Sequence, residues 1–251
     1  MKVVWIASYP KSGNTWMRFL LHHYFWGEPT NSLALNHRIP DLHRPVGGID
    51  TSQDRLFVKT HFVLSDALPF LARTDRAIVI RRHPKDVLLS GLNYAALESP
   101  TPIDSIAYAK SFIAHGGDQA WEKMGFGTWE SHARSWHTDR FPVHHTTYEA
   151  LTHDAAGEFR RVLGFLGETI DEDRLARAVQ LSDFGRLREI ERKEKARGGQ
   201  SLFRGGKASL ARQAMFMNKG AVGQSLAPIE LALDEAFDSA FAQALAAFGY
   251  G

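Results

Sequence analysis

The amino-acid sequence predicts an α/β fold: a single domain with a central parallel β-sheet that helices flank on both faces. Three observations support this prediction. Short apolar runs without polar alternation recur along the chain, as in strands buried on both sides, and helical patterns separate them. A length of 251 residues suits one domain with a substantial core. No repeat or linker divides the chain, so we expect residues 1–251 to form one unit.

The four strands are expected at short β-rich runs that end in turn-forming or charged residues. They cover residues 3–8, 56–59, 77–80 and 141–147. The first run stops at Tyr9 and Pro10, and the third stops at two arginines. Because the strands alternate with helical patterns, a parallel arrangement is favoured.

The helices are expected between and after these strands. Thr15 is expected to cap a first helix, and Pro84 to occupy the first turn of a helix over 85–95. Another helix is expected over 158–166. A C-terminal helix is expected to open near Pro228, because apolar residues recur there every four positions.

Two stretches show little regular patterning. Residues 98–128 mix Pro and Gly with a possible helix over 106–112, and residues 193–224 are rich in Gly, Lys and Arg. Long irregular segments in a compact domain are usually functional or mobile. We expect residues 39–50, 98–128 and 193–217 to wall a ligand cleft.

Composition and charge exclude several classes of protein. The apolar fraction is 44% and the charged fraction 23%, which excludes a disordered chain. Thirty basic against 28 acidic residues give a net charge of +2, so a general nucleic-acid coat is not expected and any anion site is local. The chain has no cysteine, which excludes disulfides, thiol catalysis and cysteine-bound zinc.

The distribution of apolar residues and of histidines along the chain predicts the location of the protein and its use of metals. The apolar run at the N-terminus is too short for a signal peptide, and no run of about 18 apolar residues exists for a membrane span. We therefore expect a cytoplasmic protein. The spacing of the 12 histidines fits no specific ligand set, so no metal site is expected.

Residues 8–16, Ser-Tyr-Pro-Lys-Ser-Gly-Asn-Thr-Trp, join the first strand to the first helix. Backbone N–H groups at a helix start attract anions, and Lys11 adds a full charge. The segment is not a Walker A loop. Aligning Gly13 and Thr15 with the end of that motif places Ser8 at its first glycine and Asn14 at its lysine. The segment predicts an anion-binding loop whose lysine lies three residues early.

Two further segments carry similar chemistry. Arg82 follows the third strand, and Ser90 lies about two helical turns later, so a guanidinium and a hydroxyl are able to converge on a second phosphate. Asn218, Lys219 and Gly220 belong to a basic loop bracketed by glycines, which is a weaker signal by itself.

Taken together, these three segments resemble the motifs of the cytosolic sulfotransferase family, in the same order and near the same separations. Lys59-Thr60-His61 resembles the family's Lys-Thr-His segment after the second strand. Tyr148 and Ser182 fall in two further landmarks. The resemblance covers the chain from Val4 to about Gln224. It implies the sulfotransferase fold, with a P-loop-like phosphosulfate-binding loop.

The resemblance also implies a donor, 3′-phosphoadenosine 5′-phosphosulfate (PAPS), with PAP as its product. The first loop would hold the 5′-phosphosulfate, and residues of the other segments would hold the 3′-phosphate and adenine. The residues implied in donor binding are Lys11, Ser12, Gly13, Asn14, Thr15, Trp16, Arg82, Ser90, Tyr148, Ser182, Phe184, Lys219 and Gly220.

The implied reaction moves a sulfuryl group from the donor phosphate to an acceptor hydroxyl or amine by in-line displacement. His61 is expected to act as the base, since an imidazole pKa lies near neutral pH. Lys11 is expected to stabilise the leaving phosphate, and Lys59 to steady the sulfuryl oxygens. Ser12 is expected to hold Lys11 away from the sulfate until the acceptor binds.

The sequence departs from the family pattern in the third segment. Asn218 replaces a phosphate-binding arginine, and Gln224 and Ser225 replace an Asp-Trp pair. Arg204, Lys207 or Arg212 is expected to supply the missing charge; otherwise donor affinity is lower.

Some features most resemble small bacterial enzymes that sulfate natural products, including glycopeptide antibiotics. They are the short chain, Trp129, Arg134 with Trp136, and residues 204–207. A small-molecule or natural-product acceptor is implied, with a monomer or weak homodimer. Two alternatives stay open: a P-loop phosphotransferase, which would need Mg²⁺ and a lysine at position 14, and a nucleotide-binding module without turnover.

Overall fold

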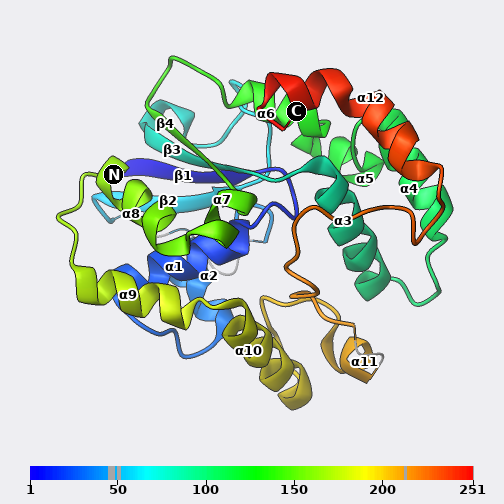
Figure 1. The fold of residues 1–251 in the computed structure, drawn as a ribbon. Coiled ribbons are helices and arrows are strands. Elements are labelled where there is room, and N and C mark those ends of the chain that lie inside the picture. The colour runs from blue at the N-terminus through cyan, green and yellow to red at the C-terminus, as the bar shows by residue number, and fades with distance from the viewer. Residues whose placement is uncertain (45–48, 50–51, 212–213, 251) are drawn as a thin grey trace.

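The computed structural model describes residues 1–44, 49, 52–211 and 214–250 (Figure 1). The described residues form a four-stranded sheet in the order β2-β1-β3-β4, with every neighbouring pair parallel. The strands are β1 (Lys2–Ser8), β2 (Arg55–Thr60), β3 (Thr74–Arg81) and β4 (Val143–Thr147). The predicted α/β class and all four predicted strands are confirmed.

Each central strand is buried on both faces, which explains why its sequence is apolar without alternation. Val4 and Ile6 of β1 face one core, whereas Val3 and Trp5 face the other, since successive side chains of a strand point to opposite faces. All four side chains are fully buried.

One face of the sheet packs against α1 (Asn14–Trp26), α7 (Tyr148–His153), α8 (Ala155–Phe165) and α9 (Glu172–Leu181) (Figure 1). Apolar residues of these helices join the even-numbered side chains of β1 in one core. The other face packs against the residues that follow β2 and against Trp136.

A second group of helices lies beside the end of β3. Its members are α3 (Pro84–Glu98), α4 (Ser105–His115), α5 (Gln119–Trp121), a π-helical turn η3 (Glu122–Phe126), α6 (Trp129–Ser135) and α12 (Leu233–Ala247). They share a core with phenylalanines of α12 at its centre. The expected support role of the C-terminal helix is confirmed.

Five further helical segments complete the described structure. These segments are η1 (Ser32–Ala34), α2 (Leu35–Arg38), η2 (Leu71–Arg73), α10 (Phe184–Arg197) and α11 (Gly206–Ala211). Phe19, Leu35 and Leu187 form a small core with residues 202 and 203. No helix of the described residues is long and apolar enough to cross a membrane.

Several expected boundaries were wrong. Thr15 does not cap α1: the helix begins at Asn14 after Gly13, which has a φ of 99° and makes no side-chain cap. The C-terminal helix begins at Leu233, five residues after Pro228, because the intervening chain forms turns. Pro84 is the first residue of α3, as expected, although the helix continues to Glu98.

The expectation of little structure over 193–224 was also wrong at its start. Helix α10 reaches Arg197, and its interior contains the buried ion pair of Glu191 and Lys195, 2.6 Å apart. Glu191 also accepts the backbone N–H groups of Phe216, at 2.5 Å, and Met217, at 2.7 Å. Buried charged residues make this helix hard to recognise from its sequence. One of them, Glu191, also holds the segment at residues 216 and 217 in place.

Candidate active site

A cavity of about 710 Å³ opens at the carboxyl ends of the strands, where parallel α/β sheets usually bind ligands. We call it the main cavity. Each strand end contributes to it: Lys11 follows β1, His61 follows β2, Arg82 follows β3, and Tyr148 follows β4. The structure therefore brings together the segments that the sequence singled out.

Most of the predicted site residues line this cavity. Those that do are Lys11, Gly13, Asn14, Thr15, Trp16, Lys59, His61, Arg82, Ser90, Tyr148, Ser182, Phe184, Lys219 and Gly220. Ser12 is fully buried behind the loop instead. The hydroxyl of Ser182 lies 2.8 Å from Nδ1 of His23, so this residue forms part of a packed wall.

The first loop turns tightly because two of its residues adopt positive φ angles, 67° at Lys11 and 99° at Gly13. A Cβ atom at Gly13 would lie 2.7 Å from the ring of Tyr148. Asn14 donates its amide to the carbonyl of Ile6, at 2.9 Å, and to the hydroxyl of Ser8, at 3.2 Å. The amide at the Walker lysine position thus ties the helix start to β1.

Lys11 is held by aromatic rings. Its ammonium lies 3.6 Å from the ring centroid of Phe216 and 4.9 Å from that of Tyr94, in cation–π geometry. The Ser12 hydroxyl has no hydrogen-bond partner among the described residues, so it does not contact Lys11 in this structure. The expected hold of Ser12 on Lys11 in the presence of the donor stays a prediction. Burial, and then the positive charge of Arg82, lower the pKa of Lys11 to about 7.

His61 has the geometry of a neutral imidazole base. Its Nδ1 lies 2.7 Å from the carbonyl oxygen of Ser8, which only accepts, so Nδ1 carries the proton and Nε2 has a free lone pair. Burial, and then the charges of Lys59 and His43, hold the pKa of His61 well below 6.5.

His43 packs directly against this base. The backbone N–H of His61 donates to Nε2 of His43 at 2.7 Å, and the two rings stack with centroids 5.3 Å apart. Phe126 closes the other side, with centroids 5.6 Å from His61 and 4.6 Å from His43. These contacts fix the orientation of the His61 ring.

Lys59 forms a buried ion pair with Asp41 at 2.6 Å. Burial lowers the pKa of Lys59 to about 8, although Asp41 partly offsets that effect. Burial raises the pKa of Asp41, but Lys59 and Arg18 outweigh it and hold the pKa below its ordinary value. Lys59 is therefore positioned by a carboxylate beside the His61 strand end.

Arg82 links the first and third segments. Its guanidinium donates to the carbonyls of Lys11, at 3.1 Å, and Ala221, at 2.8 Å, and lies 4.1 Å from the Tyr148 ring centroid. The Tyr148 hydroxyl donates to the carbonyl of Gly220 at 3.1 Å. The two loops therefore meet at one arginine.

The third segment is fixed to α3 and α10 by close contacts. Asp86 accepts the N–H of Gly223, at 2.9 Å, and both the backbone and side-chain N–H of Gln224, at 3.1 Å. Gly220 has a φ of 63°, and a Cβ there would lie 2.7 Å from the ring of Phe184. Gln224, which departs from the family pattern, thus has a structural partner.

The sequence analysis missed several residues that shape the site: Asp41, His43, Tyr94, Phe216 and Glu191. Asp41 and His43 share a short polar run beside a proline, which was the signal available. The other three lie in segments without a motif. Among the expected substitutes for an arginine at position 218, Arg204 lines the main cavity, whereas the Lys207 side chain and Arg212 lie outside the described residues.

The fold and the cavity place the chain in the class of α/β proteins with a tight loop between the first strand and the first helix that lines a cavity at the strand ends. The model of the Sulfotransferase domain family matches residues 2–249, and the chain belongs to this family. The predicted family is thereby confirmed; a particular closeness to bacterial glycopeptide enzymes stays a prediction.

Two similar proteins come from mammals. Mouse Sulfotransferase 1B1 is 27% identical over 201 residues, which cover 73% of this chain and 64% of that protein. Human Sulfotransferase 1C2 is 25% identical over 252 residues, covering 94% and 80%. The chain thus spans about two thirds of the length of mouse Sulfotransferase 1B1.

Solved structures share the fold. Mouse sulfotransferase SULT7A1 complexed with PAP matches with a TM-score of 0.69 and 19% identity, covering 97% of this chain and 84% of that one. Retinol dehydratase in complex with androsterone and inactive cofactor PAP matches with a TM-score of 0.66 and 18% identity, covering 98% and 81%. The predicted sulfotransferase fold is confirmed.

Proposed function

We propose that this chain transfers the sulfuryl group of PAPS to a hydroxyl of a small-molecule acceptor by in-line displacement. One observation carries the proposal: a neutral imidazole at His61 and a buried lysine at Lys11 line the same cavity, at adjacent strand ends. Family membership and structural relatives with PAP agree with this chemistry.

The main cavity fits a donor with two anionic ends and a planar base. Lys11, Arg82 and Lys219 supply positive charge along its wall. Two buried polar atoms of the loop region, the Ser12 hydroxyl and Nε of Arg82, have no hydrogen-bond partner within the described residues. Trp16 and Tyr148 meet edge to face at 5.6 Å and offer an aromatic wall for an adenine ring.

PAPS supplies an activated sulfuryl group, with PAP as the leaving group. His61 accepts the acceptor proton at Nε2, because its Nδ1–H is committed to the Ser8 carbonyl. Lys11 places an ammonium at the first loop, where negative charge develops on the leaving phosphate oxygen. Lys59 lines the same cavity and is paired with Asp41, so its ammonium is available to the sulfuryl oxygens.

The alternative of a P-loop phosphotransferase requires a lysine at position 14, which this chain does not have. Asn14 stands at the Walker lysine position, and its amide donates to Ile6 and Ser8. A nucleotide-binding module without turnover would keep donor binding but form no sulfated product. The two remaining hypotheses therefore separate in one transfer assay.

The proposal includes finer predictions that rest on the sequence resemblance. They are a natural-product acceptor of the kind that bacterial enzymes sulfate, a cytoplasmic location, and a monomer or weak homodimer. Trp129 and Trp136, two landmarks of that resemblance, are buried in the core, with Trp129 donating to the Arg82 carbonyl at 3.0 Å. They support the fold around the donor loop.

The test is mass-detected transfer from PAPS to a panel of phenols, sugars and hydroxylated natural products. Lys11→Ala and His61→Ala should each lower kcat by about 10²- to 10⁴-fold, the usual contribution of such groups. Lys193→Ala and His153→Ala, two exposed matched controls, should not. Full turnover in both site variants, or PAP binding without transfer to any acceptor, contradicts the proposal.

A further inference from the structure

The ammonium of Lys11 lies over two aromatic rings at the wall of the main cavity. It is 3.6 Å from the ring centroid of Phe216 and 4.9 Å from that of Tyr94. Within residues 1–44, 49, 52–211 and 214–250, the contact with Phe216 is the shortest cation–π contact. The face of an aromatic ring carries negative charge density, so it attracts the charged amine and not the neutral one.

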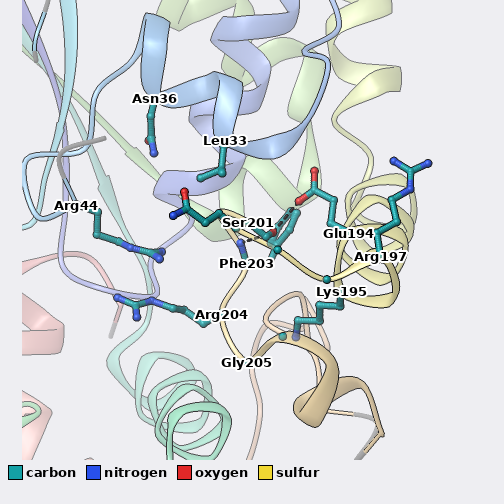
Figure 2. A pocket seen from close by; sticks show the side chains of 14 residues that line it. Leu33, Asn36, Arg44, Glu194, Lys195, Arg197, Ser201, Phe203, Arg204 and Gly205 are labelled. Atoms are coloured by element: carbon teal, nitrogen blue, oxygen red, sulfur yellow. Dashed lines mark hydrogen bonds between the residues drawn. The ribbon is translucent and has the colours of Figure 1, made fainter. Parts of the chain in front are cut away.

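Helix α10 fixes the backbone that carries Phe216. Glu191 of this helix accepts the backbone N–H of Phe216 and that of the next residue. Glu191 is paired at 2.6 Å with Lys195, which also donates to the carbonyl of Ala214 at 3.2 Å. Lys195 and Gly205 line a second cavity, of about 860 Å³, and Figure 2 shows the Lys195 side chain pointing from α10 toward Gly205. Because either charge alone would be costly to bury, the ion pair favours a single arrangement of this segment.

The ring of Phe216 is packed from two sides. Its centroid lies 5.9 Å from that of Phe203, which stacks on Phe19 of α1 at 6.4 Å. From α3, the ring of Tyr94 meets it edge to face at 6.1 Å. The amide of Asn93, also on α3, donates to the carbonyl of the residue before Phe216 at 2.9 Å. Contacts from three helices therefore fix the place of this ring.

Phe216 also connects two of the segments that line the main cavity. Its ring contacts Lys11 of the first loop, and it precedes Lys219 of the third segment by three residues. All three residues line the main cavity. A lysine side chain has four rotatable bonds, so a ring that is itself fixed restricts where the Lys11 ammonium lies.

We infer that Phe216 is a positioning residue for Lys11: the face of its ring keeps the ammonium at the cavity wall both before and after the donor binds. The ammonium stays on the ring and gains the 5′-phosphate of the donor as a second partner, so the ring stabilises the complex. The inference concerns the electron density of the ring face and not the bulk of the side chain. It rests on the proposed function, because that function brings the donor to Lys11.

The experiment replaces Phe216 alone by 4-fluoro-, 3,5-difluoro- and 3,4,5-trifluorophenylalanine. Fluorine withdraws electron density from the ring face and changes the size of the ring little, so the attraction for a cation falls while the packing is kept. The probe is PAP, titrated calorimetrically at pH 8. Burial lowers the pKa of Lys11 to about 7, so most of the free protein then carries a neutral amine and the attraction acts mainly in the complex. PAP affinity should fall with each added fluorine and be about tenfold weaker with three, the size expected for a buried cation–π contact.

The same fluorinated residues at Phe203 are the matched control. This ring packs against Phe216, and the cation–π contacts of the described residues do not involve it. PAP affinity should stay unchanged in the Phe203 series. Phe216→Leu, which keeps an apolar side chain without a ring, should weaken PAP binding about tenfold, and Phe216→Tyr should keep the affinity because it restores a ring face.

The other outcomes overturn the inference. A PAP affinity that does not change with fluorine content at Phe216, or that falls as much in the Phe203 series, assigns the ring to packing alone. A PAP affinity that rises with fluorine content shows that the ring holds the ammonium away from the donor. PAP that fails to bind the unmodified protein contradicts the proposed function instead, so the two failures are distinguishable.

Discussion

Donor binding should draw a proton onto Lys11. In the free protein, burial and Arg82 lower the pKa of Lys11 to about 7 from an ordinary value of 10.5. A lowered pKa means that the amine is mostly neutral above pH 7. The anionic donor favours the ammonium and raises the pKa again, so binding at alkaline pH must take up a proton.

The size of this uptake follows from the pKa. At pH 8, a group with a pKa of about 7 is protonated in roughly one tenth of the molecules, so full protonation on binding takes up about 0.9 proton. At pH 6, about nine tenths are already protonated, and the contribution of Lys11 to the uptake falls to about 0.1 proton. The phosphates of PAP are ionised at pH 8, since their second pKa lies near 6.

The assay is isothermal titration of PAP in two buffers with different heats of ionisation, at pH 6 and pH 8. The difference in heat gives the number of protons taken up. Lys11→Met removes the amine but keeps an unbranched chain beside Phe216 and Tyr94, and should lower the uptake at pH 8 by about 0.9 proton. Equal uptake in the two proteins at pH 8, or a difference between the two proteins that is as large at pH 6 as at pH 8, refutes this reasoning.

Three further predictions concern the loops and the base. Gly220→Ala should weaken PAP binding about tenfold, because the added Cβ would lie 2.7 Å from the aromatic ring of Phe184. Gly223→Ala also has a positive φ, 68°, but no atom lies within 4 Å of its Cβ, so this control should weaken binding less. Equal affinities of the two variants argue against the clash. Glu191→Gln should lower the free energy of unfolding by about 3–5 kcal/mol in urea titrations, since the buried Lys195 loses its partner. The control Glu189→Gln, which breaks the exposed ion pair with Lys193, should change that free energy by less than about 1 kcal/mol. Because the pKa of His61 in the free protein lies well below 6.5, kcat/KM should not fall between pH 7.5 and 6. A fall with an apparent pKa near 6.5 would show that the base is not held neutral.

The parts of the site that the sequence predicted are those that local chain geometry creates. A strand, a tight turn and a helix start occupy consecutive residues, so Lys11 and Gly13 predict an anion-binding loop without any information about the rest of the fold. Arg82 before Pro84 signals a second strand-to-helix junction in the same way. The carboxyl ends of parallel strands share one edge, which brings these residues to one cavity.

Helix boundaries were less predictable, because turns and long-range anchors set them. Helix α10 is rich in charge, and its buried face includes Glu191 and Lys195. Hydrophobic periodicity does not readily reveal a helix whose buried residues are an ion pair and a single leucine, Leu187. Its partner segment begins 25 residues away, at the Phe216 N–H, and carries no motif.

Composition and local motifs alone determined the fold class, the strand ends, the sulfotransferase resemblance and the residues Lys11, His61 and Arg82. Tertiary structure alone decided the surroundings that set their chemistry: Phe216 against Lys11, His43 against His61, and Asp41 against Lys59. The physical reason is that a pKa and a side-chain orientation depend on burial and on neighbours across the fold, which sequence spacing does not encode. Arg44 and Arg204, 160 positions apart, line the same main cavity for the same reason.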